Sequence, residues 1–380
     1  MRAELTMLSS AGHTVELYEV DNQVIQSTGD KIYAAASLFY SHHSSKEMSR
    51  LLHIFRPDLL HIHNWFPLLS PSIIAVAASA GIPVVQTLHN FRMLCANAIL
   101  YRDGKVCRDC VGKAVPLGAA VHGCYSGNRT GSALVAAAFA YHRLAQTWKG
   151  VSMFIALSEF QRALLIQGGL DPAQIVVKPN FVEDTGEPDD SSGNYALFVG
   201  RLTPEKGIRT VLKAWCQNKL PIPLKIMGNG PLVNEVREKA ASLPGVEYLG
   251  QRSTPEVYAA MAGAKFLIFP SEWYEPFALT IVEAFSRGTP VLAADLESIA
   301  ELVKDGETGW RFTAGDATDL AAKAMSIFSD NERYRAIRQR CRKAYQERYT
   351  EKSNYGLLLN IYERAIRSNC ALSKCGVVTL

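Results

Sequence analysis

The chain has 380 residues, enough for two domains at about 150 residues each. Hydrophobic residues make up 48% and charged residues 20%, a composition that excludes an intrinsically disordered chain. The net charge of +4 comes from 40 basic and 36 acidic residues, so charge gives no support to nucleic-acid binding.

The sequence carries no export or membrane signal that we can identify. No apolar run approaches the roughly 18 residues of a membrane-spanning helix. Glu4 interrupts the region of a possible signal peptide, and no long apolar core follows it. Together with eight cysteines, these features predict a protein of the reducing cytoplasm, where disulfides are not expected.

Short β-branched runs alternate with longer amphipathic stretches over residues 1–182. This alternation is typical of a parallel sheet covered by helices. The predicted strands lie at residues 14–20, 58–63, 82–89, 151–157 and 175–178. The predicted helices lie at residues 48–55, 72–80 and 160–166, and Ser158 is the expected N-cap of the last one.

Residues 183–193 are acidic and rich in turn-forming residues, which indicates a linker. The alternation starts again over residues 194–350. The predicted strands lie at 195–199, 224–227, 246–249, 264–269 and 290–294, and the predicted helices at 208–216, 232–243, 255–261 and 278–286. We therefore predict an α/β protein with two Rossmann-like domains facing a cleft, with ligands beyond the carboxyl ends of the strands.

From about residue 330 the chain is strongly helical and basic. Its cations form either a solvated helix face or a contact with an anionic membrane surface. They are Arg335, Arg338, Arg340, Arg342 and Lys343. Residues 351–368 are expected to form a helix that packs back on the first domain, and residues 369–380 a loose tail.

Residues 271–288 (SEWYEPFALTIVEAFSRG) carry two glutamates, Glu275 and Glu283, around the start of a predicted helix. Eight helical residues rise about 12 Å, roughly the span of a sugar, a diphosphate and a ribose. The backbone N–H groups of Phe277, Ala278 and Leu279 are expected to be unpaired at the helix start, where they could hold phosphate oxygens. The two carboxylates could meet a sugar and a ribose, or they could be exposed glutamates of an amphipathic helix.

Residues 198–207 (FVGRLTPEKG) form a second candidate segment. A strand ends at Gly200, where no Cβ blocks the approach of a ligand. Thr203 is the expected N-cap of a helix, with proline as its first residue. Arg201 and Lys206 flank this helix start and could both face a diphosphate, or they could be solvated cations of a surface helix.

Residues 226–231 (IMGNGP) run from a predicted strand into Gly228 and Gly230. By itself this segment is as consistent with an ordinary turn as with a binding loop. It lacks the full glycine pattern of a dinucleotide-binding site, which needs a strand, GxGxxG and a helix.

In this order on one domain, the three segments resemble the nucleotide-sugar domain of retaining glycosyltransferases with the GT-B fold, and more narrowly family 4, the group 1 glycosyltransferases. The resemblance covers about residues 10–365, and EPFALTIVEA at 275–284 is its most specific part. It implies that Glu275 contacts the donor sugar and Glu283 the ribose. It also implies that Arg201 and Lys206 bind the diphosphate and stabilise the leaving group. Ala278 stands where the family usually has glycine.

The first domain contributes HIHNWFPLLSP at 61–71 and TLHNFRMLC at 87–95, each directly after a predicted strand. His89 matches the family histidine that touches the donor sugar near the reacting carbon, whereas His61 and His63 have no assigned role. The family retains the anomeric configuration, with the leaving phosphate as base in a front-face attack. The resemblance therefore implies that catalysis requires no cofactor besides the nucleotide-sugar donor.

Four cysteines cluster in the insert at residues 95–126, with the spacing C-x11-C-x2-C-x13-C. They are Cys95, Cys107, Cys110 and Cys124. Four thiolates that include one CxxC pair could hold a structural zinc ion and help to order the insert. Reduced, unliganded cysteines and disulfides are the alternatives.

One departure from the family pattern concerns the beginning of the chain. Family members open with a strand, a glycine-rich loop and a helix, whereas this sequence begins inside the predicted helix, which ends at Ala11 and Gly12. The strand that is central in a doubly wound sheet is absent from the sequence. Either the natural start lies upstream, or the enzyme is impaired or split.

We expect a glycosyltransferase that moves a sugar from a nucleotide-diphosphate donor to a glycan or lipid-linked acceptor in surface polysaccharide assembly. It would work in the cytoplasm, with peripheral contact to the inner face of the membrane as a further possibility. One alternative is an impaired or truncated homologue that acts as a binding or partner subunit. Another is a sugar-nucleotide epimerase of the same fold, which the EPFALTIVEA segment disfavours.

Overall fold

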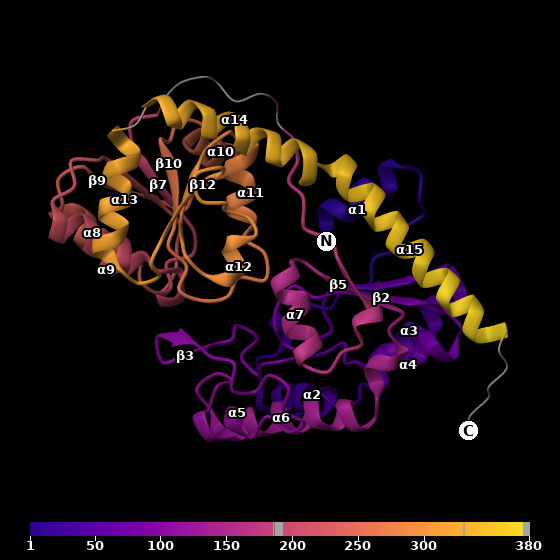
Figure 1. Cartoon of the computed structure of the whole chain (residues 1–380). Helices are drawn as coiled ribbons and strands as arrows, with labels where there is room; N and C mark the ends of the chain where they lie inside the picture. The colour runs from indigo at the N-terminus through magenta and orange to yellow at the C-terminus, as the bar shows by residue number, and fades with distance from the viewer. Residues whose placement is uncertain (185, 187–192, 330, 375–380) are drawn as a thin grey trace. The chain divides into compact units, whose positions relative to one another are not determined.

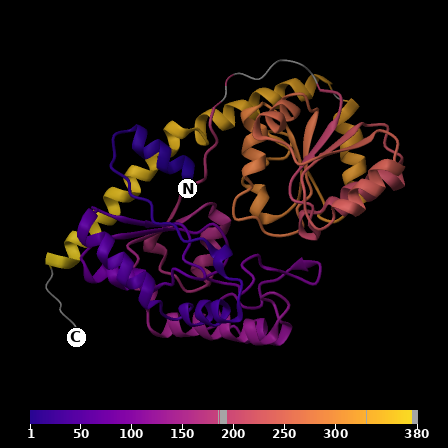
Figure 2. The same ribbon diagram turned by 180° about the vertical axis from the view of Figure 1, so that it is seen from behind.

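The computed structural model describes residues 1–184, 186, 193–329 and 331–374, so most of the predicted linker at 183–193 lies outside the described residues. Contacts divide the chain into two compact units (Figures 1 and 2). The first unit contains Met1–Ile99, Arg108–Pro179 and the chain from Tyr355 onward. The second contains Leu100–Cys107 and Asn180–Asn354.

The first unit is built on a four-stranded parallel sheet with the order β1-β2-β5-β6. Its strands are β1 (Leu60–Ile62), β2 (Val84–Thr87), β5 (Met153–Ala156) and β6 (Ile175–Val177). All four residues of β2 and of β5 are buried, as expected for strands of a parallel sheet that is covered on both faces. These four strands lie within the stretches that the sequence predicts.

Helices surround this sheet, and more of them form than the sequence predicts. They are α1 (Arg2–Ser10), α2 (Thr28–Ser37), α3 (His42–Phe55), α4 (Ser72–Ser79), α5 (Leu117–His122), α6 (Arg129–Leu144) and α7 (Glu159–Gln167). Ser158 caps α7 as predicted, because its side chain accepts a hydrogen bond from the Gln161 amide. Short 3-10 turns lie at Asn22–Val24, Thr147–Gly150 and Pro172–Gln174.

The strand predicted at residues 14–20 is not formed. α1 ends before Ala11 as expected, but residues 13–20 have no regular structure and are mostly exposed. A strand is held by hydrogen bonds to a neighbour, and β1 ends the sheet in the described part of the chain. Among the described residues, 13–20 form no such ladder with β1 or with any other strand.

The C-terminal helix α15 (Glu351–Lys374) belongs to the first unit from Tyr355 onward. Its Tyr362 hydroxyl lies 2.7 Å from His61 Nδ1, and Asn369 donates to the Gly81 carbonyl at 2.7 Å. The predicted helix end at residue 368 is too early, since α15 continues into the predicted tail.

The second unit contains a six-stranded parallel sheet with the order β12-β11-β10-β7-β8-β9. Its strands are β7 (Ala196–Val199), β8 (Leu224–Met227), β9 (Val246–Gly250), β10 (Phe266–Phe269), β11 (Val291–Ala294) and β12 (Gly309–Phe312). The first five agree with the predicted strands, and β12 is not predicted. The chain moves outward from β7 to β9 and then returns to the other side of β7 with β10, so the order reverses between β7 and β10.

Helices cover both faces of this sheet (Figure 1). They are α8 (Ile208–Asn218), α9 (Val233–Ser242), α10 (Thr254–Ala262), α11 (Leu279–Ser286), α12 (Glu297–Ala300), α13 (Ala317–Ser329) and α14 (Asn331–Arg348). Successive residues of β7 point to opposite faces. Phe198 packs in the layer of α8 and α13, whereas Leu197 packs in the layer of α11 and α14. Each such buried side chain contributes about 1.5–3 kcal/mol.

The basic residues of α14 do not form one solvated face, contrary to the first of the two alternatives. Arg338 and Arg342 are buried, and Arg340 donates to the carbonyl oxygens of Glu307 and Gly306. Arg335 and Lys343 are exposed. The helical period places these side chains alternately toward the core and toward solvent. Within the described ranges, no helix is long and apolar enough to cross a membrane.

In the insert of the first unit, β3 (Tyr101–Arg102) and β4 (Lys105–Val106) form a short antiparallel hairpin. This hairpin lies within Leu100–Cys107, which is part of the second unit. α5 packs against α6, and the Tyr125 amide donates to Ser132 Oγ at 2.8 Å. The insert is therefore ordered by helix packing and backbone hydrogen bonds.

Candidate functional site

A cavity of about 200 Å³ lies at the carboxyl ends of β7 and β10, where the strand order of the second sheet reverses. Loops after neighbouring strands diverge at such a point and leave a crevice that binds ligands in doubly wound folds. The cavity is lined by Phe198, Val199, Gly200, Arg201, Lys206, Ile268, Phe269, Pro270, Ser271 and Thr280. It thus joins the predicted segments at 198–207 and 271–288.

Lys206 and Glu275 form an ion pair beside this cavity, with 2.5 Å between Nζ and Oε1. Ser271 Oγ donates to the same carboxylate oxygen at 2.7 Å. The Glu275 backbone amide donates to Ser298 Oγ at 3.2 Å, which fixes the loop before α11. Glu275 is only 5% exposed, so the pair is held in a partly desolvated position where its charges interact strongly.

The loop that carries Glu275 is tied to the loop that carries Lys206. The Glu272 amide donates to the Glu205 carbonyl at 2.8 Å, and Thr210 Oγ1 donates to the Glu272 carboxylate at 2.6 Å. Thr203 does not cap a helix as predicted; its hydroxyl donates to Glu205 Oε1 at 2.7 Å. A 3-10 turn, Pro204–Lys206, precedes α8 here.

Trp273 is a site residue that the sequence interpretation missed. Lys206 Nζ lies 5.2 Å from the centroid of its ring, a cation–π distance. The indole N–H is buried and has no acceptor among the described residues. A buried donor without a partner costs about 1–3 kcal/mol and is typical of sites where a ligand or water supplies the acceptor.

The start of α11 agrees only in part with the prediction. The helix begins at Leu279, one residue after the predicted start at Ala278. Glu275 lies in the loop before the helix, so the rise of eight helical residues between Glu275 and Glu283 does not apply. The Leu279 amide donates to the Phe277 carbonyl at 3.2 Å and is not unpaired. Nothing in the described ranges accepts a hydrogen bond from the backbone amides of Phe277 and Ala278, which remain available to an anion.

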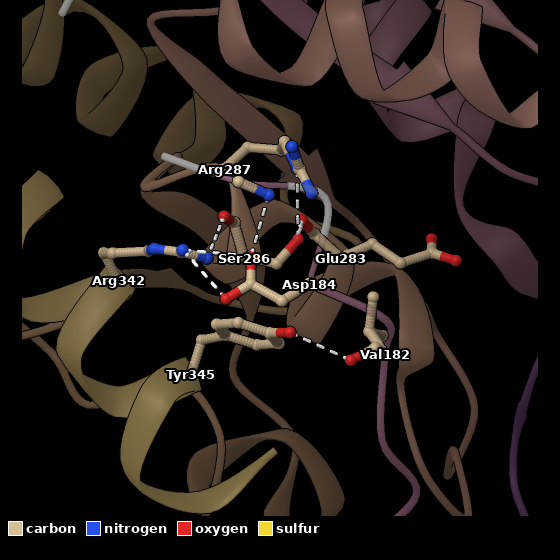
Figure 3. A network of polar contacts seen from close by, with 8 residues as sticks. Val182, Asp184, Glu283, Ser286, Arg287, Arg342 and Tyr345 are labelled. Carbon is tan, nitrogen blue, oxygen red and sulfur yellow. Dashed lines mark hydrogen bonds and ion pairs between the residues drawn. The ribbon is translucent and has the colours of Figure 1, made fainter. Parts of the chain in front are cut away.

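Glu283 lies on α11 with its carboxylate pointing away from the neighbouring cluster of polar residues (Figure 3). Burial raises the pKa of its carboxyl above the ordinary value. No cation pairs with it in the described part of the chain. A desolvated carboxylate without a cation is suited to accept hydrogen bonds from hydroxyl groups of a ligand.

The end of α11 that carries Glu283 is anchored by a network around Arg342 (Figure 3). Arg342 donates to both carboxylate oxygens of Asp184 at 3.0 Å and to the Ser286 carbonyl at 2.8 Å. The Tyr345 hydroxyl donates to the Val182 carbonyl at 2.9 Å. Burial raises the pKa of Tyr345 to about 12, so this hydroxyl stays a donor at neutral pH.

The glycines of the third predicted segment are required by close backbone contacts. A Cβ on Gly228, whose φ is +145°, would lie 1.9 Å from the Gly200 carbonyl oxygen. A Cβ on Gly230, at φ +157°, would lie 2.6 Å from the Leu202 carbonyl oxygen. The β8 loop therefore packs directly on the β7 loop, next to the cavity that Gly200 and Arg201 line.

The predicted histidine, His89, lies in the first unit after β2. Its Nε2 is 2.9 Å from Nδ1 of His63, and His63 Nε2 is 3.5 Å from the Glu4 carboxylate. Glu4 in turn accepts a hydrogen bond from Lys178 at 2.7 Å. The sequence interpretation missed Glu4 and Lys178. Their signal is a single charged residue on an otherwise apolar helix face and another at the end of an apolar strand.

The four insert cysteines do not form a zinc site in the structure. In the part of the chain that is described, no three side chains of His, Cys, Asp or Glu come together so that they could hold a metal ion. Cys95 is buried and donates to Asn97 Oδ1 at 2.8 Å. The donor set therefore does not fit the predicted zinc ion.

Two family profiles match consecutive parts of the chain. Glycosyl transferase 4-like domain matches residues 6–180, and glycosyl transferases group 1 matches residues 181–344. Together the two profiles cover residues 6–344, which include the segments at 61–71, 87–95, 198–207, 226–231 and 271–288.

Individual relatives match the chain over part of its length. The chain is 28% identical over 305 residues to glycogen synthase of Mycobacterium tuberculosis, which covers 75% of this chain and 64% of that protein. It is 31% identical over 175 residues to phosphatidyl-myo-inositol mannosyltransferase of Mycolicibacterium smegmatis, with 45% of this chain and 44% of that one covered. The chain thus spans less than two thirds of the length of these relatives.

Solved structures share the fold over most of the chain. Anabaena HepE in complex with UDP has a TM-score of 0.64 at 19% identity, covering 94% of this chain and 88% of that one. A glycosyltransferase from Rickettsia africae has a TM-score of 0.66 at 16% identity, covering 95% and 87%.

Two parallel-sheet units, with a crevice lined by Arg201 and Lys206 at the reversal point of the second sheet, define a protein of the GT-B fold. Within that class the two profile matches are specific: the chain belongs to the group 1 glycosyltransferases, family 4.

Proposed function

We propose that this protein transfers a sugar from a nucleotide-diphosphate donor to an acceptor hydroxyl, with retention of the anomeric configuration. The observation that carries the proposal is the cavity at the carboxyl ends of β7 and β10, where Arg201, Lys206 and Glu275 meet. The names of similar proteins support it, since HepE has been solved with UDP-glucose as well as with UDP.

Cleavage of the sugar–phosphate bond leaves negative charge on the diphosphate and positive charge on the sugar. In our proposal Arg201, Lys206 and the free amides of Phe277 and Ala278 stabilise the diphosphate, each preorganised before the reaction. The acceptor oxygen forms the new bond to the sugar on the face that the phosphate leaves, and the acceptor proton passes to a phosphate oxygen. These steps conserve charge and protons, and they require no nucleophile from the protein.

Glu275 and Glu283 have separate roles in this proposal. Glu275 accepts hydrogen bonds from sugar hydroxyls and holds Lys206 in place when no donor is bound. Glu283 accepts from the ribose hydroxyls, as its desolvated carboxylate suits. His89 contacts the donor sugar from the first unit.

We further propose that the acceptor is a glycan or a lipid-linked sugar in surface polysaccharide assembly, and that the enzyme works in the cytoplasm. The name of the mannosyltransferase relative, which specifies phosphatidyl-myo-inositol, supports a lipid-linked acceptor. In that case the enzyme contacts the inner face of the membrane peripherally.

The test is release of nucleotide diphosphate from a panel of UDP-, GDP- and ADP-sugars, with and without a lipid extract as acceptor source. We expect turnover with one nucleotide class, and a loss of at least about 100-fold in Lys206→Ala, because one charge-stabilising donor contributes about 2.7–4 kcal/mol. Arg209→Ala is the matched control, since Arg209 pairs with Glu235 on the exposed surface of the same unit. Nucleotide binding without any turnover would contradict the proposal and favour a partner subunit.

A further inference from the structure

A row of buried and half-buried polar side chains lies at the carboxyl ends of the strands of the first unit. His63 follows β1, His89 follows β2, and Lys178 follows β6, while Glu4 projects from α1. Lys178 is 0% and Glu4 7% exposed. The pair is 2.7 Å apart, so two charges that would be costly to bury alone are held together.

The ionisation states within this row follow from its surroundings. Burial raises the pKa of Glu4, but Lys178 and His63 outweigh it and hold that pKa below the ordinary value. Burial lowers the pKa of His63 and that of His89 to about 4. At neutral pH, Glu4 is therefore a carboxylate, and each of the two imidazole rings carries a single proton.

The two rings are joined edge to edge. Their planes are inclined by only 18°, and their centroids are 5.2 Å apart while His63 Nδ1 and His89 Nε2 are 2.9 Å apart. The centroid distance exceeds the nitrogen–nitrogen distance by no more than the sum of the two ring radii. The two nitrogens therefore lie on the line that joins the centroids. This is the geometry of one linear hydrogen bond, which needs one ring to donate and the other to accept.

The carboxylate of Glu4 decides which ring donates. It lies 3.5 Å from His63 Nε2 and favours a proton on that nitrogen. Since His63 is neutral, its Nδ1 is then an acceptor, and His89 Nε2 must carry the proton of the shared hydrogen bond. The remaining nitrogen, His89 Nδ1, is left unprotonated, and no described residue forms a hydrogen bond with it.

We propose that Glu4, held by Lys178, is a positioning residue that fixes the tautomer of His89 through His63, so that His89 Nδ1 accepts a hydrogen bond from a donor-sugar hydroxyl. The step from His89 to the sugar rests on the proposed function. The relay from Glu4 to His89 depends only on contacts within the first unit.

Glu4→Gln gives a specific result if this relay exists. The Lys178 ammonium donates to Oε1, so the glutamine carbonyl must take that place and the amide NH2 must face His63 Nε2. His63 Nε2 then becomes an acceptor and its Nδ1 a donor. His89 Nε2 accepts in turn, and the proton of His89 moves to Nδ1. Both rings therefore exchange tautomers, without any change in their packing.

The experiment records ¹⁵N–¹H long-range spectra of the full chain with ¹⁵N-labelled histidine at neutral pH, with His89 and His63 assigned from single His→Gln variants. Both rings of the native chain should show protonated Nε2, and both should show protonated Nδ1 in Glu4→Gln. Glu19→Gln is the matched control, because Glu19 pairs with Arg2 near the same helix and is 52% exposed. The control should keep the native tautomers.

Donor turnover measured on the same variants completes the test. Inverted tautomers with turnover at least tenfold lower in Glu4→Gln support the proposal. A native His89 with protonated Nδ1, an unchanged His89 tautomer in Glu4→Gln, or inverted tautomers with unchanged turnover would overturn it. If Glu4→Gln does not fold, the native spectrum still decides. Absence of turnover in the native chain counts against the proposed function alone, since the spectra need no donor.

Discussion

Lys206 and Glu275 neutralise one another across 2.5 Å when no ligand is present. A diphosphate that approached Lys206 would compete with the Glu275 carboxylate for the ammonium group. Until then, the ion pair holds the ammonium group in position beside the cavity. The side chains of Lys206 and Glu275 are 19% and 7% exposed, which makes their attraction stronger than that of a surface pair. In the proposed function, donor binding therefore exchanges the contact of Lys206 with Glu275 for one with the diphosphate.

Glu283 gives a prediction about pH. Burial raises the pKa of this carboxyl, and the ribose hydroxyls donate stronger hydrogen bonds to its ionised form than to its protonated form. Nucleotide affinity should therefore fall as the pH drops through this raised pKa, by up to about tenfold per pH unit. The measurement is the Kd of the nucleotide by calorimetry between pH 5 and 8.

Glu283→Gln is the reference for that measurement, because the terminal phosphate of the nucleotide also titrates, with a second pKa of about 6. The variant should bind more weakly at pH 8 and should lose the part of the pH dependence that belongs to Glu283. An identical slope in the native chain and in the variant would contradict the assignment.

At the scale of elements, the contact between the β7 and β8 loops shapes the proposed donor site. Gly228→Ala would drive a Cβ into the Gly200 carbonyl, so the loops must separate. We expect a loss of about 3 kcal/mol or more in stability and at least tenfold weaker nucleotide binding. Gly250→Ala is the matched control at the end of β9.

Gly250 also has a positive φ, +74°, but a Cβ there meets nothing within 4 Å. Its variant should cost only about 1–2 kcal/mol, the penalty of the left-handed backbone alone, and should keep native affinity. Urea unfolding and nucleotide calorimetry check both variants. Equal effects of the two substitutions would show that the loop contact is unimportant.

The network around Arg342 gives a second prediction at this scale. Arg342→Ala leaves Asp184 and the Ser286 carbonyl without their shared partner, at a cost of about 2–3 kcal/mol. Because this substitution removes the anchor of α11, hydrogen exchange of the α11 amides should be faster in Arg342→Ala than in the native chain. Lys343→Ala, one residue along the same helix, removes an exposed pair with Glu347 at 3.8 Å and should cost at most about 0.5 kcal/mol. Similar exchange in both variants would contradict the anchoring role.

Much of the second unit could be predicted from the sequence because local signals coincide there. The strand before Gly200 is an apolar run that ends at a glycine, and the structure agrees with it to within one residue. The helix predicted at 278–286 likewise agrees with α11 to within one residue, but Glu275 lies in the loop before it, so the two glutamates are not separated by a continuous helix. β12 was missed because a short edge strand carries little alternation of its own.

Pairing between distant residues could not be predicted. Glu4 and Lys178 are 174 positions apart, and nothing local indicates that they are buried together. Likewise residues 14–20 have the composition of a strand, but strand formation depends on a neighbour elsewhere in the chain. The cysteine spacing suggested zinc, whereas the structure does not gather the four thiols into a ligand group.

At the scale of the whole molecule, the two units divide the proposed work. The second carries the proposed nucleotide site with Lys206, Glu275 and Glu283, and the first carries His89 and its proposed relay. Both belong to one family, whose two profiles match consecutive halves of the chain. The central claim is that the second unit holds an intact site for a nucleotide diphosphate.

The most direct test is calorimetric titration of the purified chain with UDP, GDP and ADP, compared with Glu283→Ala. We predict binding of one nucleotide with a Kd on the order of micromolar, weakened at least tenfold in Glu283→Ala. Glu238→Ala, an exposed glutamate on α9, should bind like the native chain. Absence of binding by a folded sample, or undiminished binding by Glu283→Ala, would contradict the account.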